Sequence, residues 1–332
     1  MRKIKIDDLT LEKDNNFFIL ADTAFSHEGD IDYLKNQIDN AYKAKVNGIK
    51  FQILLDYKDA YTKNSNKIRN WCIDQEEDWI EAFELAKAKG LEIVVLPIDM
   101  KSLKFCKDNI NYINALEIHS ISLNEVPFLR EIKTISTNII LGVGGRKSKD
   151  IFFTLKELNQ NNSISNKNTI LMFGFQSFPT KINNINLSKF RSLKNQFKLI
   201  LGYADHTYYK DYKTGNDIIK YSFLYGARIF EKHLVLEIGE KRVDYEAAIS
   251  HKEFIELREN LEHFIKILGN DDLNILNEAE KRYRDREKQL IVKRDLKKGD
   301  ILNVSNIGYK VSTEKSDFEQ KDYDQLIKKE LK

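Results

Sequence analysis

The fold is decided by two apolar runs that each end at a histidine, LILGYADHT at residues 199–207 and GARIFEKH at residues 226–233. The residues between them, 211–225, have the spacing of an amphipathic helix. In a parallel sheet closed by helices, the carboxyl ends of consecutive strands meet at one mouth. Four polar residues stand at these two ends: Asp205, His206, Glu231 and His233.

The same alternation of strand and helix patterns extends over about 250 residues. Strands are expected at 17–21, 48–54, 91–97, 114–119, 138–145, 169–174, 199–207 and 226–233. Helices are expected at 30–44, 76–89, 101–107, 125–133, 148–159, 187–196, 211–225 and 251–269. This order predicts an α/β fold, a (β/α)8 TIM barrel. The alternative, a doubly wound open sheet, usually has a G-x-G-x-x-G turn after its first strand, and none is found here.

The amino-acid composition of the chain changes after the last long helix, where a strongly charged segment follows. We expect a barrel domain at 1–270, a charged linker at 271–288 and a small β-rich appendage at 289–332. Within the appendage, LKKGDIL at 296–302 predicts a tight hairpin. A segment of this size buries little apolar surface, so it is expected to pack on the barrel or on another subunit.

The composition narrows the class of protein. The chain has 42% hydrophobic and 32% charged residues and a net charge of +3, which is typical of a globular protein and indicates neither nucleic-acid nor membrane binding. Its two cysteines, Cys72 and Cys106, are far apart, and its first residues have no apolar signal-peptide core. We therefore expect a cytoplasmic protein without disulfides. Separately, the long polar segment at 56–70, after the second strand, is expected to be a flexible active-site loop.

The two strand-end histidines indicate a metal site. Neutral imidazoles beside carboxylates are the ligands of an N/O-coordinated divalent ion. The alternative is that both histidines are half-buried polar residues of the strand ends. Two of them on adjacent strands favour the metal.

Further polar residues fall at the predicted strand ends and form a candidate site. They are Asp22, Lys50, Gln52, His119, Ser120 and Gln176. Lys50 lies between two apolar neighbours on its strand and therefore points into the barrel, where it needs an anion. A salt bridge to Asp22 and a contact to a substrate anion are equally compatible with this position. Arg146, after two glycines, is a weaker candidate for anion binding.

Several of these segments resemble the sialic acid synthase family. ADTAFSHEG at 21–29 is similar to its A-E-I-G-x-N-H-x-G opening and IKFQ at 49–52 to its V-K-F-Q strand. YADHT at 203–207 resembles S-D-H-T, EKH at 231–233 matches E-K-H, and DYEAAI at 244–249 resembles P-D-H-K-A-S-L. The segment from 289 to 300 looks like the start of the family's antifreeze-like (SAF) domain, here shortened.

The resemblance implies a metal-dependent condensation of phosphoenolpyruvate with an open-chain N-acylated amino-sugar aldehyde. The product would be a nine-carbon 2-keto-3-deoxy acid. It also implies a homodimer and a divalent ion at His206 and His233, usually Mn2+, with Mg2+ or Co2+ as alternatives. Catalytic roles fall on Asp22, Glu231 and His206. Substrate contacts fall on Lys50, Gln52, His119, Ser120, Arg146, Gln176, Asp205 and Asp244.

The chain also departs from the family pattern. The opening glutamate is Asp22, and the phosphate-binding lysine of the fourth strand falls on Glu117. Other phosphate-site positions hold Leu96 and Gly142, and Gln176 and Phe178 replace an asparagine and a tyrosine. Two alternatives therefore stay open: a metal-dependent barrel aldolase or isomerase that does not use phosphoenolpyruvate, and a non-catalytic sugar-binding subunit.

Overall fold

The computed structural model describes residues 16–62, 68–159, 169–175, 177 and 179–330, and the backbone of a short antiparallel ribbon, β1 (Lys5–Ile6) with β2 (Leu9–Thr10). The chain divides into two compact units, Met1–Ile267 and Leu268–Lys332. None of the described helices combines the length and apolar character that a membrane crossing requires.

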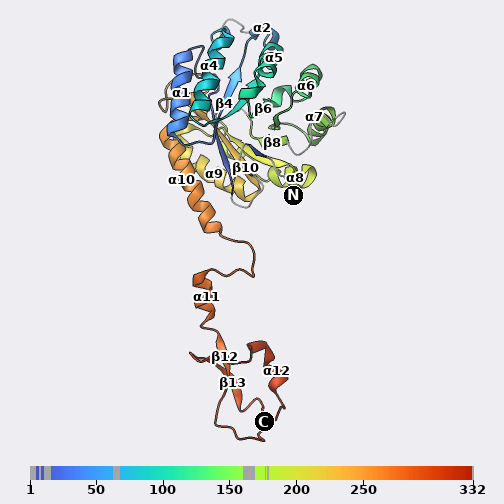
Figure 1. Ribbon diagram of the computed structural model, residues 1–332, viewed down its shortest axis with the longest axis vertical. Coiled ribbons are helices and arrows are strands. Elements are labelled where there is room, and N and C mark those ends of the chain that lie inside the picture. The colour runs from blue at the N-terminus through green and yellow to red at the C-terminus, as the bar shows by residue number, and fades with distance from the viewer. Residues whose placement is uncertain are drawn as a thin grey trace. The chain divides into compact units, whose positions relative to one another are not determined.

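The first unit is a closed barrel of parallel strands (Figure 1). Its strands are β3 (Phe18–Asp22), β4 (Gly48–Ile53), β5 (Glu92–Pro97), β6 (Ala115–Ile118), β7 (Asn138–Gly142), β8 (Thr169–Phe173), β9 (Ile200–Asp205) and β10 (Ala227–Leu234). Each pairs with the next, and β10 also pairs with β3, which closes the sheet. The short strand β11 (Ala248–Ile249) pairs in parallel with the end of β10. The (β/α)8 prediction is confirmed, and the open-sheet alternative is wrong.

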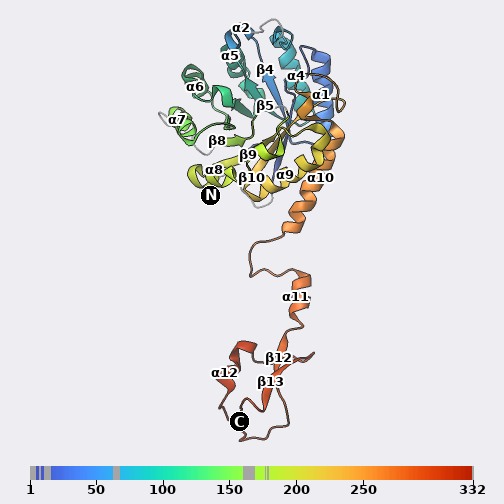
Figure 2. The same cartoon turned by 180° about the vertical axis from the view of Figure 1, so that it is seen from behind.

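Helices surround the strands on the outside (Figure 2). They are α1 (Ile31–Lys43), α2 (Tyr57–Ala60), α4 (Glu76–Ala88), α5 (Met100–Asp108), α6 (Val126–Ile132), α7 (Ser148–Asn159), α8 (Lys189–Phe197), α9 (Tyr212–Leu224) and α10 (His251–Leu268). Asp30 caps α1 by accepting the Asp32 and Tyr33 N–H groups. The segment expected to be a loop at 56–70 contains α2, and its residues 63–67 lie outside the described residues.

Alternation along the strands creates two apolar layers. One fills the lumen and includes Phe18, Leu20, Val94, Ile140 and Ile229. The other packs the outer face of the strands against the helices. The parity of a residue, meaning whether it occupies an odd or an even position along its strand, therefore decides where its side chain points. One parity faces the lumen and its mouth, and the other faces the helix layer.

The second unit has a small core of its own. It contains α11 (Glu278–Arg284), the antiparallel pair β12 (Lys288–Val292) and β13 (Ile307–Val311), and α12 (Tyr323–Leu326). Its buried apolar side chains are Leu290, Leu302, Ile307 and Leu326. The tight hairpin predicted at 296–302 is wrong in detail. These residues form a turn within the longer connection between β12 and β13, and Ile301 bridges to Glu330.

Candidate active site

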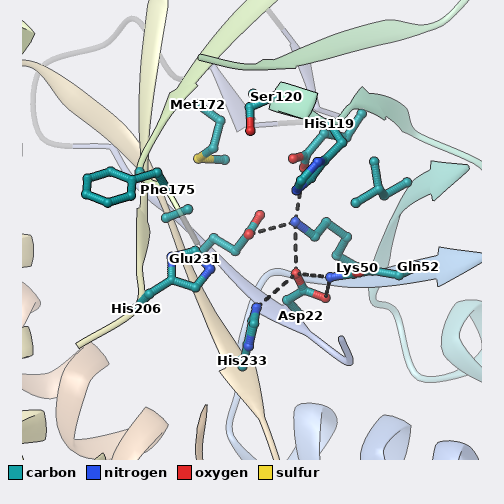
Figure 3. Close-up of a pocket in the computed structure, with 15 residues that line it drawn as sticks. Asp22, Lys50, Gln52, His119, Ser120, Met172, Phe175, His206, Glu231 and His233 are labelled. Atoms are coloured by element: carbon teal, nitrogen blue, oxygen red, sulfur yellow. Dashed lines mark hydrogen bonds and ion pairs between the residues drawn. The ribbon is translucent and has the colours of Figure 1, made fainter. Parts of the chain in front are cut away.

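A recess lies at the carboxyl mouth of the barrel, and its two halves differ in chemistry (Figure 3). The half formed by β3, β4, β10 and the end of β9 is polar and ionisable: Asp22, Lys50, Gln52, His206, Glu231 and His233. The half formed by β5, β7, β8 and β9 is apolar: Leu96, Gly142, Met172, Phe175 and Ala204. Gly174 after β8, and Glu117, His119 and Ser120 of β6 and its exit, complete the described lining.

Lys50 lies at the centre of a buried charge cluster. Its Nζ is 2.9 Å from Asp22 Oδ2, 2.6 Å from Glu231 Oε1 and 3.1 Å from Glu117 Oε2. All four side chains are at most 5% exposed. The Asp22 salt bridge allowed by the sequence is therefore present, together with two further carboxyl groups.

One ammonium cannot neutralise three buried carboxylates, so the carboxyl groups titrate as an interacting set. Burial, opposed by Lys50 and reinforced by the neighbouring carboxylates, raises the pKa of Glu231 well above its ordinary value. Burial also raises the pKa of Glu117. Despite its burial, the charges of Lys50 and His233 hold the pKa of Asp22 below its ordinary value. Asp22 is therefore an ionised partner of Lys50, and Glu231 is the carboxyl group of the cluster whose pKa burial raises furthest.

Asp22 is held in place by groups other than Lys50. Gln52 donates its amide hydrogens to both carboxylate oxygens, at 3.2 Å and 3.0 Å. The backbone N–H of Ala24 donates to Oδ1 at 2.7 Å. Gln52 thus shares a face of β4 with Lys50, as its parity predicts, and orients the Asp22 carboxylate.

The two candidate metal ligands lie side by side. The rings of His206 and His233 meet edge to face with centroids 4.9 Å apart, and His233 Nε2 is 3.7 Å from Asp22 Oδ2. Burial and the neighbouring His233 lower the pKa of His206 to about 3, which keeps this imidazole in the neutral form that ligates metals.

The donor chemistry here suits a divalent ion. Glu231 Oε2 is buried and has no hydrogen-bond partner within the part of the chain that the structure describes. Imidazole nitrogens and a carboxyl oxygen are the donor types that an N/O-coordinated ion takes. Among the described residues, however, no group of three or more histidine, cysteine or acidic side chains is arranged to hold a metal. The metal at His206 and His233 therefore stays a prediction.

Asp205 lies on the opposite face of its strand from the recess. It forms a buried ion pair with Lys232 of β10 and accepts hydrogen bonds from Thr207 Oγ1 at 2.7 Å and Tyr203 Oη at 3.2 Å. It is not part of the recess lining. The structure does not bring Asp205 to the substrate side. Instead, its pair with Lys232 joins β9 to β10 beside the two histidines.

His119 and Arg146 were predicted to contact the substrate. His119 lines the recess, but burial, with the positive charge of Lys50, lowers its pKa to about 4, so it is neutral. The Arg146 guanidinium donates to the backbone oxygens of Ser120 at 2.5 Å and Ile121 at 2.8 Å. Arg146 therefore supports the loop that presents Ser120 and is not part of the lining.

Two predicted residues remain to be placed. Asp244 lies beside the recess, in electrostatic contact with His233 and Asp22, and burial raises its pKa. It has a left-handed backbone conformation with φ of 65°. Gln176 lies outside the described residues, as does Phe178.

Glu117 departs from the family pattern in the sequence, but its contact with Lys50 was not predicted. The available signal was parity: Glu117 alternates with the outward-facing Leu116 and Ile118 and therefore faces the lumen. The Asp205–Lys232 pair was missed in the same way. Lys232 lies between Glu231 and His233, which both line the recess, so it has to face outward.

An ionisable recess at the carboxyl mouth of a (β/α)8 barrel is the arrangement of a barrel enzyme. The NeuB family model matches residues 37–272, and the chain belongs to the NeuB family.

Known relatives share nearly the whole chain. The uncharacterized protein MJ1065 of Methanocaldococcus jannaschii is 29% identical, covering 93% of this chain and 89% of the relative. The N,N'-diacetyllegionaminic acid synthase of Campylobacter jejuni is 25% identical, covering 87% and 88%. A crystal structure of the sialic acid synthetase of Leptospira borgpetersenii superposes with a TM-score of 0.75 at 24% identity, covering 85% of this chain and 96% of that one, and confirms the fold.

Proposed function

We propose that this protein condenses phosphoenolpyruvate with an open-chain N-acylated amino-sugar aldehyde to give a nine-carbon 2-keto-3-deoxy acid of the sialic type. The observation that carries the proposal is the meeting of Asp22, Lys50, Gln52, His206, Glu231 and His233 around one recess. These residues come from β3, β4, β10 and the end of β9, and each lies in a segment that resembles a family motif, with Asp22 in place of the family's glutamate. The names of the synthase relatives support the same reaction class.

The reaction balances with groups that the recess supplies. Carbon 3 of phosphoenolpyruvate bonds to the aldehyde carbon, and the aldehyde oxygen takes a proton. Glu231, whose pKa burial raises well above its ordinary value, is the proposed donor. Water then adds at carbon 2 and returns one proton to Glu231. The bond between carbon 2 and the phosphate oxygen breaks, and phosphate leaves with the other proton as carbon 2 becomes a ketone. Lys50 and Ser120 are assigned to phosphoenolpyruvate, and Gln52 and Asp244 to the sugar.

We assign a divalent ion to His206 and His233, with Mn2+ as the expected metal. When bound, it supplies Lewis-acid polarisation of the aldehyde. His206→Ala and His233→Ala are expected to lose metal and activity together. Elemental analysis of the dialysed protein measures the metal content, and release of phosphate from phosphoenolpyruvate measures the activity. His263→Ala, at an exposed position farther along α10, is the control. Stoichiometric metal in the His233→Ala protein would contradict the assignment.

The function is tested by incubating Mn2+-loaded protein with phosphoenolpyruvate and a panel of N-acylated amino-sugar aldehydes. The expected result is release of one phosphate per 2-keto-3-deoxy acid detected by mass spectrometry. Lys50→Met should abolish both signals. Product formation without phosphate release would show a different reaction.

One observation favours a second candidate function. Lys50 already faces three carboxyl groups, and one of them, Glu117, lies where an anion would otherwise meet the ammonium. A metal-dependent aldolase or isomerase acting on a sugar derivative needs no phosphate contact there. Turnover of an amino sugar in the absence of phosphoenolpyruvate would select this candidate.

A further inference from the structure

The charges around the recess are distributed unevenly. Asp22, Lys50 and Glu231 belong to β3, β4 and β10, on the polar half. The wall from β5 to β9 offers Leu96, Gly142, Met172 and Ala204, which carry no charge. Glu117 of β6 is the one ionisable carboxyl group on this wall among the described residues that line the recess. A ligand placed against this wall therefore meets Glu117.

Among the described residues of this wall, no second cation compensates for Glu117. His119 is neutral, because burial lowers its pKa to about 4. The Arg146 guanidinium is engaged by the backbone oxygens of Ser120 and Ile121. Within the described lining of the recess, Lys50 is therefore the one ammonium group for an anion, and Glu117 Oε2 is 3.1 Å from its Nζ.

The three carboxyl groups around Lys50 are not equivalent. Asp22 is fixed by Gln52 and the Ala24 N–H, so it keeps its position whatever Lys50 contacts. Glu231 approaches from the strand that carries His233, on the metal side. Glu117 approaches from the uncharged wall, which also carries Ser120 at the exit of β6.

We propose that Glu117 determines the anion affinity of this recess, by occupying the side of the Lys50 ammonium that a phosphate or carboxylate group would bind. Removing its charge frees that side of Lys50 and also removes a repulsive charge from the wall. The inference rests on the proposed function only in taking the ligand to be an anion of this class.

The test is calorimetric titration of inorganic phosphate, and separately of phosphoenolpyruvate, into the full-length protein. Glu117→Gln keeps the shape of the side chain and removes its charge. We expect it to bind both anions at least tenfold more tightly than the unsubstituted protein. The gain should disappear in Lys50→Met/Glu117→Gln, because the freed ammonium is then absent.

Glu131→Gln is the matched control. Glu131 pairs with Lys107 on the outer surface at 2.7 Å, so this change alters the net charge equally without touching the recess. It should leave both affinities unchanged. Glu117→Leu, which fills the same space without polar atoms, should also tighten binding and serves if the glutamine variant misfolds by circular dichroism.

Equal affinity in the unsubstituted and Glu117→Gln proteins would overturn the inference, as would a gain that persists without Lys50. These outcomes are separable from the fate of the proposed function. Tighter phosphate binding by Glu117→Gln, with no condensation product from the unsubstituted protein, sustains this inference and rejects the synthase. Product formation by the unsubstituted protein, with no increase in phosphate affinity in Glu117→Gln, supports the synthase and rejects this inference.

Discussion

Lys50 is buried among carboxyl groups because its strand parity sends it into the lumen, where water cannot solvate an ammonium. The carboxyl groups of Asp22, Glu117 and Glu231 replace that water. The dependence is mutual, since an ionised carboxylate in the same place needs a cation.

Lys50→Met is therefore expected to lower the free energy of unfolding by about 3 kcal/mol, measured by urea denaturation at pH 7. The carboxyl groups would then be left without their counter-ion. Adding Glu117→Gln to this variant should restore part of the loss, because one fewer carboxyl group remains. Additive costs of the two substitutions would show that Lys50 and Glu117 do not interact.

His27 gives a pH dependence with a definite sign. It is fully buried, and burial lowers its pKa from the ordinary 6.5 to about 4. As pH falls below 6.5, the unfolded chain takes up a proton that the folded chain takes up only near pH 4. The free energy of unfolding therefore falls as the solution is acidified through this window.

From pH 7 to pH 4.5 this one group is expected to cost about 2.5 kcal/mol of stability. The measurement is urea denaturation at both pH values for the unsubstituted protein and His27→Asn, whose side-chain oxygen can still accept the Gly29 N–H that His27 Nδ1 accepts at 3.1 Å. The buried His119 and His206 contribute equally in both proteins. An identical pH dependence of the two would refute the assignment.

At the level of elements, the mouth of the barrel depends on close approach between the ends of β7, β8 and β9. A Cβ on Gly144 would lie 1.6 Å from the Gly174 carbonyl oxygen, and one on Gly174 would lie 2.2 Å from the Ala204 oxygen. Gly174 also has φ of +143°, which side chains rarely adopt. These glycines allow the strand ends to meet where the uncharged wall of the recess forms.

Gly144→Ala is expected to lower the free energy of unfolding by about 3 kcal/mol or more, because backbone has to move to accept the methyl group. Gly145→Ala is the matched control. A Cβ there meets nothing within 4 Å, and only its φ of +72° opposes alanine. Its cost should be about 1–2 kcal/mol. Thermal and urea denaturation of the pair would distinguish the two, and equal costs would exclude the steric explanation.

Hydrophobic periodicity predicted the strands and long helices well, because it is a local property of the chain. Helix α1 begins where Asp30 caps it, and α7 spans Ser148–Asn159 as its apolar spacing predicts. Errors concentrate where short polar segments have no periodicity. Helix α2 lies within an expected loop, and the expected hairpin at 296–302 is part of a longer connection.

At the scale of the whole molecule, the two compact units have separate cores. We propose that the barrel folds without the second unit. A chain ending at residue 270 should unfold cooperatively, with a midpoint within about 4 °C of the full-length protein, as measured by calorimetry. Loss of cooperative unfolding would show that the barrel needs the appendage.

Light scattering on the full-length protein and on the chain ending at residue 270 tests the homodimer that the resemblance implies. The full-length protein is expected at twice the chain mass. A dimer that becomes a monomer on truncation would assign the contact to the second unit, and a full-length monomer would contradict the dimer.

The sequence alone determined the barrel, the strand ends and most of the ionisable residues of the mouth, because strand and helix periods are local properties and parallel strands bring their carboxyl ends together. Only the tertiary structure decided their partners. It directed Asp205 to Lys232 and away from the recess, engaged Arg146 with backbone oxygens, and set Glu117 against Lys50. These pairings join segments far apart in the chain, and barrel closure and strand register determine them.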